Sequence, residues 1–274
     1  MLAVYQTDIP GYARAYRMSA GEDVSWRWVR RIHSRAGRTL APSTATAAEL
    51  LAHGVHRVFL WRRGVDADLF NPARRDEAVR RALAPNGEVL VGYVGRLAAE
   101  KRVELQEVTA KLPRVRVVVI GDGPARSPVR RALPEAHFLG QRHGQQLAKL
   151  YASLDIFVHT GPLETFCQTV QEAMASGVPV IAPAAGGPLD LVEQGRTGYL
   201  VPPRDGAALA GAVAALVSDE PLRKKFGEAA RAAVVGRTWA AVGDELLDHY
   251  RAVIAGSGDR VGEVTRLVQP VSVQ

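Results

Sequence analysis

The chain contains very little cysteine. Cys167 is the single one among 274 residues, so no internal disulfide can form. A structural zinc site built on cysteine thiolates is excluded for the same reason. Sparse cysteine is typical of proteins kept in a reducing compartment, and it therefore favours the cytoplasm.

Long apolar runs are missing as well. No stretch of about 18 uninterrupted apolar residues occurs, so we predict no membrane-spanning helix. The opening letters MLAVYQTDIP lack the basic start and the long apolar centre of a secretory signal. We therefore expect a cytoplasmic protein, and peripheral contact with the inner face of the membrane stays open.

Positive charge is concentrated in the first quarter of the chain. The net charge is +7, and residues 1–63 contain ten arginines against four acidic residues. Several of these arginines surround the helix predicted over 22–38, in which Trp26, Val29 and Ile32 recur at helical spacing. Such a surface attracts nucleic acid, anionic lipid or an anionic substrate, and a solvated basic face explains it equally well.

Short apolar strands alternate with helical segments along most of the chain. Strands such as EVLVGYVGR, VRVVVIGDG and VPVIAP are separated by helices. This alternation predicts an α/β fold with a mostly parallel sheet and helices on both faces. The turn residues and proline in DADLFNPARRD indicate a linker between two domains. The expected parts are a first unit over 1–65, a linker over 66–87, a main domain over 88–240, and a C-terminal helix and tail over 241–274.

Two glutamates stand eight positions apart in the stretch LETFCQTVQEAMASGVPVIA. Thr165 and Gln168 form a T-x-x-Q capping box, which predicts a helix that begins at Thr165 and ends at Gly177. Glu164 would lie just before this helix, and Glu172 about two turns inside it on the same side. The positive end of a helix can hold a phosphate, and a carboxylate can accept hydrogen bonds from a vicinal diol. The pattern suits a nucleotide sugar, with solvated helix charges as the alternative.

Two cations follow the first strand of the main domain, in the letters VGRLAAEK. Arg96 comes at the carboxyl end of that strand, and Lys101 comes five residues later. Ligands of doubly wound sheets bind at this edge, so the pair suits a diphosphate that gains charge as it leaves. Two surface cations are the alternative. The letters GDGPAR lack the third glycine of the dinucleotide fingerprint, so they indicate a nicotinamide cofactor only weakly.

These motifs together resemble those of the retaining glycosyltransferases with two Rossmann-like domains, the GT-B type, and in particular glycosyltransferase family 4. The matching stretches are RRGVDADLFNP, VGRLAAEK, VIGDGP and the run from GPLETF to GYLVPP, which cover about residues 55–210. The letters YQTDIPGYARAY and TLAPSTAT are similar to those of actinobacterial GDP-mannose-dependent α-mannosyltransferases that act on glycolipids. The resemblance implies a complete C-terminal Rossmann-like domain after the last part of an N-terminal one.

The resemblance also implies roles for individual residues. Arg96, Lys101 and Glu164 would be the catalytic group, with the two cations on the donor diphosphate and the glutamate on sugar hydroxyls. Arg142 would approach the base, and Glu172 would hold the ribose. The full set of implied donor-binding positions is Gly95, Arg142, Thr165, Phe166, Cys167 and Glu172.

The reaction implied by the resemblance moves a hexose from a nucleotide sugar, GDP-mannose or a UDP-sugar, to a lipid-linked acceptor. It proceeds with retention at the anomeric carbon and needs no obligatory metal or other cofactor. Nucleic acid is not among the implied partners. Gln6 stands where many members of this family carry a histidine that touches the transferred sugar. Its role stays open, because glutamine can hydrogen-bond but cannot carry a proton.

The resemblance further implies that this chain is truncated. Members of the family have a full N-terminal domain, and we expect roughly a hundred residues of it to be missing, judged by usual domain sizes. A donor-binding fragment without turnover is therefore the alternative function. A nicotinamide-dependent oxidoreductase rests on the letters GDG alone, and a nucleic-acid binder rests on the basic first quarter alone.

Overall fold

The computed structural model describes residues 1–16, 18 and 21–256. Their contacts divide them into two units. The first holds residues 1–64, the short segment 163–166 and residues 239–256, and the second holds residues 65–162 and 167–238. The sequence did not indicate that residues 163–166 and the last helix group with the first unit. The tail predicted at the end of the chain falls on residues 257–274, outside the described residues.

A small parallel sheet forms the centre of the first unit. Its strands are, in spatial order, β1 (Leu2–Val4), β2 (Arg38–Ala41) and β3 (Val58–Leu60). The helices of this unit are α1 (Ile9–Ala15), α2 (Gly21–His33), α3 (Thr44–Ala52) and α12 (Trp239–Ile254). Helix α3 begins where the Ser43 hydroxyl accepts a hydrogen bond from the Thr46 amide, and Gly54 follows its end with a φ of +77°.

Helix α2 divides its tryptophans between the core and the solvent. Trp26 and Val29 are buried in the apolar cluster that also contains Leu50 of α3. Trp28 is 55% exposed, and Arg27, Arg30 and Arg31 of the same helix are exposed too. The helix therefore packs one stripe in the core and keeps a basic face with an aromatic side chain open. In the described ranges, no helix is both long enough and apolar enough to cross a membrane.

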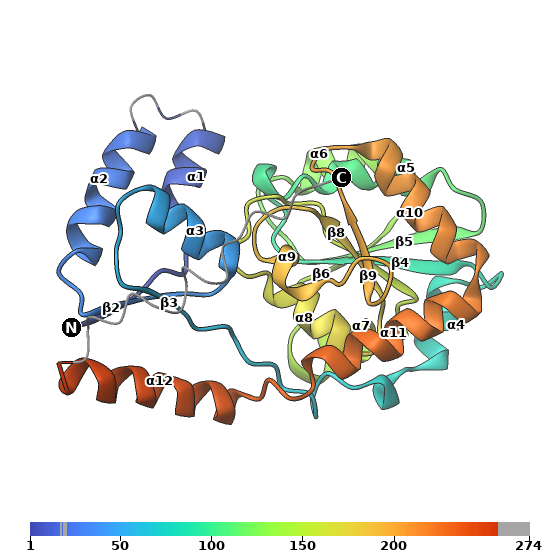
Figure 1. The fold of residues 1–274 in the computed structure, drawn as a ribbon. Helices are drawn as coiled ribbons and strands as arrows, with labels where there is room; N and C mark the ends of the chain where they lie inside the picture. The colour runs from blue at the N-terminus through green and yellow to red at the C-terminus, as the bar shows by residue number, and fades with distance from the viewer. Residues whose placement is uncertain (17, 19–20, 257–274) are drawn as a thin grey trace. The chain divides into compact units, whose positions relative to one another are not determined.

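Six parallel strands form the sheet of the second unit. Their spatial order is β6 (His137–Gly140), β5 (Val115–Ile120), β4 (Val89–Val94), β7 (Ile156–Val158), β8 (Val180–Pro183) and β9 (Gly198–Val201). Helices lie on both faces of this sheet (Figure 1). They are α4 (Glu77–Leu83), α5 (Glu107–Ala110), α6 (Arg126–Ala132), α7 (Gly144–Ser153), α8 (Gln168–Ala175), α9 (Pro188–Leu191), α10 (Gly206–Ser218) and α11 (Glu220–Val234). The predicted α/β fold with a mostly parallel sheet is confirmed.

The strand order of this sheet reverses between β4 and β7. The chain runs from β4 through β5 to β6, and then returns to the other side of β4 with β7, from which it continues to β8 and β9. Loops that leave β4 and β7 therefore run in opposite directions along the sheet. In open α/β sheets, the crevice at such a reversal, outside the carboxyl ends of the strands, is where ligands bind.

The segment predicted as a linker, residues 66–87, groups with the second unit and contains the short helix η1 (Pro72–Arg74) together with α4. Arg75 and Arg80 pair with the Asp155 carboxylate at 3.3 and 2.9 Å. The Asp76 side chain caps the start of α4. These contacts attach the segment to the second unit through side chains far apart in sequence, which local turn signals do not reveal.

Candidate functional site

The loop after β4 packs tightly against the loop after β5. The amides of Gly95 and Leu97 donate hydrogen bonds of 3.0 and 2.9 Å to carbonyls at the end of β5 and just beyond it. A side-chain carbon added at Gly121 would lie 1.9 Å from the Gly95 carbonyl oxygen, and one added at Gly123 would lie 2.3 Å from that of Leu97. Both glycines also have positive φ angles. The packing of two loops thus explains the glycines of GDG, without a nicotinamide site.

Arg96 and Lys101 lie on the loop that leaves the carboxyl end of β4. Arg96 is half exposed and forms an ion pair with the buried carboxylate of Glu100. Lys101 ends the short helix η2 (Ala99–Lys101), and its backbone carbonyl accepts a 2.7 Å hydrogen bond from the Thr160 hydroxyl. Because Thr160 follows β7, this bond joins the two loops that leave the reversal of the sheet. The two predicted cations therefore lie on the loop after β4, at the carboxyl edge of the sheet where the strand order reverses.

His159 follows β7 directly and is 2% exposed. Its ring stacks on Tyr93 of β4, with 6.2 Å between ring centroids and 13° between ring planes. The Tyr93 hydroxyl donates a 2.9 Å hydrogen bond to the Arg96 carbonyl. This aromatic pair supports the loop that carries Arg96.

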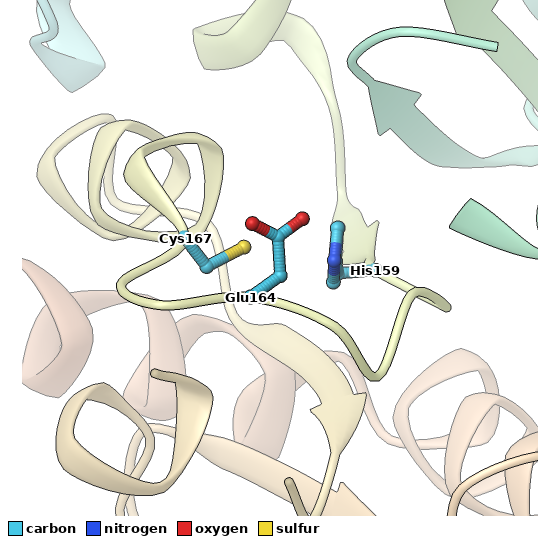
Figure 2. Close-up of side chains that lie close together, drawn as sticks. All are labelled: His159, Glu164 and Cys167. Atoms are coloured by element: carbon cyan, nitrogen blue, oxygen red, sulfur yellow. The ribbon is translucent and has the colours of Figure 1, made fainter. Parts of the chain in front are cut away.

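The chain between β7 and α8 carries three side chains that metal ions commonly use as ligands. Figure 2 shows those of His159 and Cys167 together with that of Glu164, which lies between them along the chain. Within the second unit, a ring nitrogen of His159 and the Cys167 sulfur lie within 4.8 Å of each other. Glu164 groups with the first unit. That no metal is obligatory stays a prediction.

Helix α8 begins later than the capping box predicts. It starts at Gln168, after Cys167 in the left-handed conformation with a φ of +76°, and no side chain caps it. The predicted start at Thr165 is therefore wrong. The left-handed residue breaks the helical path, and within the first unit the Thr165 hydroxyl donates instead to the Gln6 carbonyl at 2.8 Å. Gly177 follows the end of α8 with a φ of +72°, as predicted.

Glu172 lies in the second turn of α8 and meets Tyr151 of α7. The Tyr151 hydroxyl, which is fully buried, donates a 3.1 Å hydrogen bond to the Glu172 carboxylate. Burial raises the pKa of Glu172 from 4.5 to about 7, and the bond from Tyr151 opposes part of this rise. Burial, together with the nearby Glu172 charge, raises the pKa of Tyr151 well above its usual value. Glu172 is thus a carboxyl group that changes charge near neutral pH.

The predicted site residues divide between the two units. Those of the second unit are Gly95, Arg96, Lys101, Arg142, Cys167 and Glu172, and those of the first are Gln6, Glu164, Thr165 and Phe166. The structure joins Gln6 to Thr165 through the hydrogen bond described above. Arg142 follows β6, is exposed and donates to the Gln141 carbonyl. The roles of all these residues in binding or chemistry stay predictions.

Two residues of this region were missed by the sequence analysis. Nothing in the sequence pairs Tyr151 with Glu172, because the two are 21 positions apart on different helices. His159 could have been found, since a polar residue directly after a buried strand of a parallel sheet stands at the same edge as Arg96.

Two known protein families match most of the chain. The sequence pattern of the family described as "Glycosyl transferases group 1" matches residues 74–233, and that of "Glycosyltransferase Family 4" matches residues 3–69. A GDP-mannose-dependent alpha-mannosyltransferase of Mycobacterium tuberculosis is 51% identical over 92% of this chain. One of Mycolicibacterium smegmatis is 51% identical over 92% as well. This chain spans 66% and 67% of the length of these relatives.

Solved structures share the fold. Sucrose-phosphate synthase from Thermosynechococcus elongatus matches with a TM-score of 0.81 at 27% identity, over 93% of this chain and 68% of that one. Anabaena HepE, crystallised with UDP and glucose, matches with a TM-score of 0.80 over 92% of this chain and 71% of that one. At 22% identity, the second likeness supports the fold alone.

Proposed function

The chain belongs to the group 1 glycosyl transferases, and on that premise we propose that its second unit binds a nucleotide sugar at the carboxyl edge of the six-stranded sheet. The observation that carries this proposal is the reversal of strand order between β4 and β7. Arg96 and Lys101 follow β4 there, and the Lys101 carbonyl is bonded to the loop after β7. Two cations on this edge suit a diphosphate.

We propose GDP-mannose as the donor, because relatives 51% identical are GDP-mannose-dependent alpha-mannosyltransferases. Arg96 and Lys101 would hold the diphosphate, Arg142 would approach the base, and Glu172 would accept hydrogen bonds from the ribose. The remaining donor contacts would come from Gly95, Glu164, Thr165, Phe166 and Cys167. Only the ionised carboxylate of Glu172 accepts with both oxygens, so donor binding would strengthen as the pH rises through about 7.

The proposed reaction transfers the hexose with retention to a hydroxyl of the acceptor. The bond between the anomeric carbon and the diphosphate oxygen breaks, and the acceptor oxygen forms the new bond on the same face of the sugar. The leaving diphosphate takes the acceptor proton, and Arg96 and Lys101 stabilise the charge that develops on it. No step in this scheme needs a metal. The main contributions of the protein would be positioning and charge stabilisation.

The acceptor would be a lipid-linked molecule at the inner face of the membrane. Helix α2 supports this part of the proposal, because it exposes Trp28 beside several arginines. An aromatic side chain among cations suits the interface of an anionic lipid surface. Contact would be peripheral.

A donor-binding chain without turnover is the second candidate. It is favoured by one observation, namely that the chain spans about two thirds of the length of the mannosyltransferases it matches. Both candidates bind a nucleotide sugar, and only the first one transfers the sugar.

Titration calorimetry with GDP-mannose, GDP, UDP and NAD tests the shared part of the proposal. We expect binding of a nucleoside diphosphate and none of NAD. Lys101→Gln should weaken GDP binding by about ten-fold, which corresponds to about 1.4 kcal/mol. Lys111→Gln is the matched control, because Lys111 is an exposed lysine of the same unit that pairs with Glu107. Binding of NAD alone, or equal affinities for both variants, would overturn the donor site.

Transfer of radiolabelled mannose from GDP-mannose into a membrane lipid extract separates the two candidates. Labelled lipid supports the transferase. Nucleotide binding without labelled lipid supports the donor-binding chain. Unchanged donor affinity in the double variant Glu164→Gln, Glu172→Gln would remove both acids from the proposed site.

A further inference from the structure

A pocket opens at the edge of the six-stranded sheet that is opposite to the proposed donor site. Its volume is about 600 Å³, and all its lining residues belong to the second unit. Val89 is the first residue of β4, Asp155 comes directly before β7, and Pro179 comes directly before β8. The pocket thus lies at the amino ends of the strands, whereas the proposed donor site lies at their carboxyl ends. A pocket of this size can hold a small organic ligand.

Positive charge exceeds negative charge in the lining. The cationic side chains are Arg75, Arg80, Arg114, Arg223 and Lys224, and the acidic ones are Glu88, Asp155 and Glu220. These cations come from the segment before β4, the turn before β5 and helix α11, so separate parts of the chain converge on one space.

The acids in the lining are already engaged. Asp155 pairs with both Arg75 and Arg80, and it also accepts a 2.8 Å hydrogen bond from the backbone amide of Leu90. Glu88 pairs at 3.0 Å with Arg116, a residue outside the lining. Glu220 pairs at 2.8 Å with Lys224. All three acids therefore have cationic partners, and the lining keeps more cations than acids.

Two arginines of the lining form no ion pair in the described part of the chain. Among the described residues, the exposed guanidinium of Arg114 has neither an ion pair nor a hydrogen-bond partner. Arg223 donates to the carbonyls of Leu216 and Val217 at the end of α10, and it forms no ion pair in the described part of the chain. Because neither arginine is in an ion pair among the described residues, both guanidinium groups can bind an anion. Guanidinium groups bind phosphate through paired N–H donors.

A polar residue of the same lining is left without a partner. Ser176 is 2% exposed, and its hydroxyl has no hydrogen bond to any described residue. Buried hydroxyl groups are usually paired, and an unpaired one calls for an explanation such as a ligand or water.

We propose that this pocket binds a small anion that carries phosphate. The unpaired Arg114, the absence of an ion pair at Arg223 among the described residues and the excess of cations favour an anion, and the planar fork of an arginine can bind two phosphate oxygens at once. The site is separate from the proposed donor site and does not depend on it.

The test is calorimetric titration of the full chain with inorganic pyrophosphate in low salt, with GDP present in excess to occupy the donor site. We expect one binding event for the unchanged chain, and a loss of affinity of at least ten-fold for Arg114→Asn. Asparagine removes the charge and tolerates the left-handed backbone of residue 114, whose φ is +59°. Unchanged thermal unfolding without ligand would show that the variant folds.

Arg204→Asn is the matched control. Arg204 is also an exposed arginine with a left-handed backbone, at a φ of +67°, and it does not line the pocket. Its variant should bind pyrophosphate like the unchanged chain.

No binding to the unchanged chain, equal affinity in Arg114→Asn, or an equal loss in both variants would overturn the site. Citrate that binds as tightly as pyrophosphate would overturn the preference for phosphate. A loss of pyrophosphate affinity in Arg114→Asn but not in Arg204→Asn reports on this pocket even if GDP does not bind.

Discussion

The buried hydroxyl of Tyr151 donates a 3.1 Å hydrogen bond to the carboxylate of Glu172 across the contact between α7 and α8. This bond fixes the direction of one carboxylate oxygen and leaves the other open. It also opposes part of the rise in pKa that burial causes in Glu172. Glu172, the residue proposed to bind the ribose, is thereby held in one place, and its carboxyl group remains able to ionise near neutral pH.

The raised pKa of Glu172 predicts how stability depends on pH. A carboxyl whose pKa rises from 4.5 when unfolded to about 7 when folded binds its proton more tightly in the folded state. Its contribution to stability is complete below about pH 4.5 and is lost as the pH rises to 7. The loss is about 3 kcal/mol at most. Glu172→Gln, which resembles the protonated form, should lack this loss.

Chemical denaturation of both proteins at pH 5 and pH 8 measures this effect. We expect similar free energies of unfolding at pH 5 and a more stable Glu172→Gln at pH 8. Glu107→Gln is the control, because Glu107 is exposed and paired with Lys111. The same difference between the proteins at both pH values would contradict the assignment to Glu172.

Tyr151→Phe should raise the pKa of Glu172 above about 7, because the bond that favours the ionised form is lost. If Glu172 holds the ribose, GDP binding at pH 7 should weaken by about ten-fold, or about 1.4 kcal/mol. The midpoint of its pH dependence should also move upward. Titration calorimetry between pH 6 and pH 9 checks both effects.

Tyr199→Phe serves as the control for this change. The Tyr199 ring packs on Phe226, and its hydroxyl has no hydrogen bond to any described residue. A midpoint that stays in place in Tyr151→Phe, with weaker binding alone, would indicate that the tyrosine only supports the fold.

The sheet of the second unit could be predicted because its information is local. Apolar runs such as Val89–Val94 and Val115–Ile120 need no distant partner to be recognised as strands. Arg96 and Lys101 could be selected as candidates from the sequence because they come shortly after the end of β4. The carboxyl edge of a parallel sheet is where ligands bind.

The start of α8 could not be predicted, because it depends on contacts far along the chain. The capping-box pattern of Thr165 and Gln168 is genuine, but the Thr165 hydroxyl bonds to the carbonyl of Gln6, 159 positions away. The left-handed backbone of Cys167 adds a break that a cysteine does not signal. The bond between Tyr151 and Glu172 was missed for the same reason, since only the packing of two helices brings them together.

The left-handed backbone of Cys167 predicts an inverted order of stability for two variants. A residue with a Cβ atom at a φ of +76° is strained by about 1–2 kcal/mol, and glycine is free of that strain. Both Cys167→Gly and Cys167→Ala remove the thiol, so their difference isolates the backbone. We expect the glycine variant to be more stable by about 1 kcal/mol in urea denaturation.

The same comparison inside α8 should give the opposite sign. Ala173 lies in the middle of this helix, where Ala173→Gly should lose about 1 kcal/mol. A glycine variant at position 167 that is less stable than the alanine variant would mean that the left-handed conformation is absent in solution.

The close packing of the loops after β4 and β5 predicts that Gly121 tolerates no side chain. A Cβ atom there would lie 1.9 Å from the Gly95 carbonyl oxygen, a backbone atom that cannot rotate away. Gly121→Ala should therefore lower the free energy of unfolding by more than about 2 kcal/mol, because the loop must shift or a positive φ must be strained.

Gly211→Ala is the matched control with the opposite expected sign. Gly211 lies exposed in α10 with no atom within 4 Å of an added Cβ, so alanine should stabilise the chain by about 0.5–1 kcal/mol. Denaturation of both variants under one set of conditions provides the measurement. A Gly121→Ala chain as stable as the unchanged one would show that the two loops do not contact each other as described, and the position of Arg96 beside them would need revision.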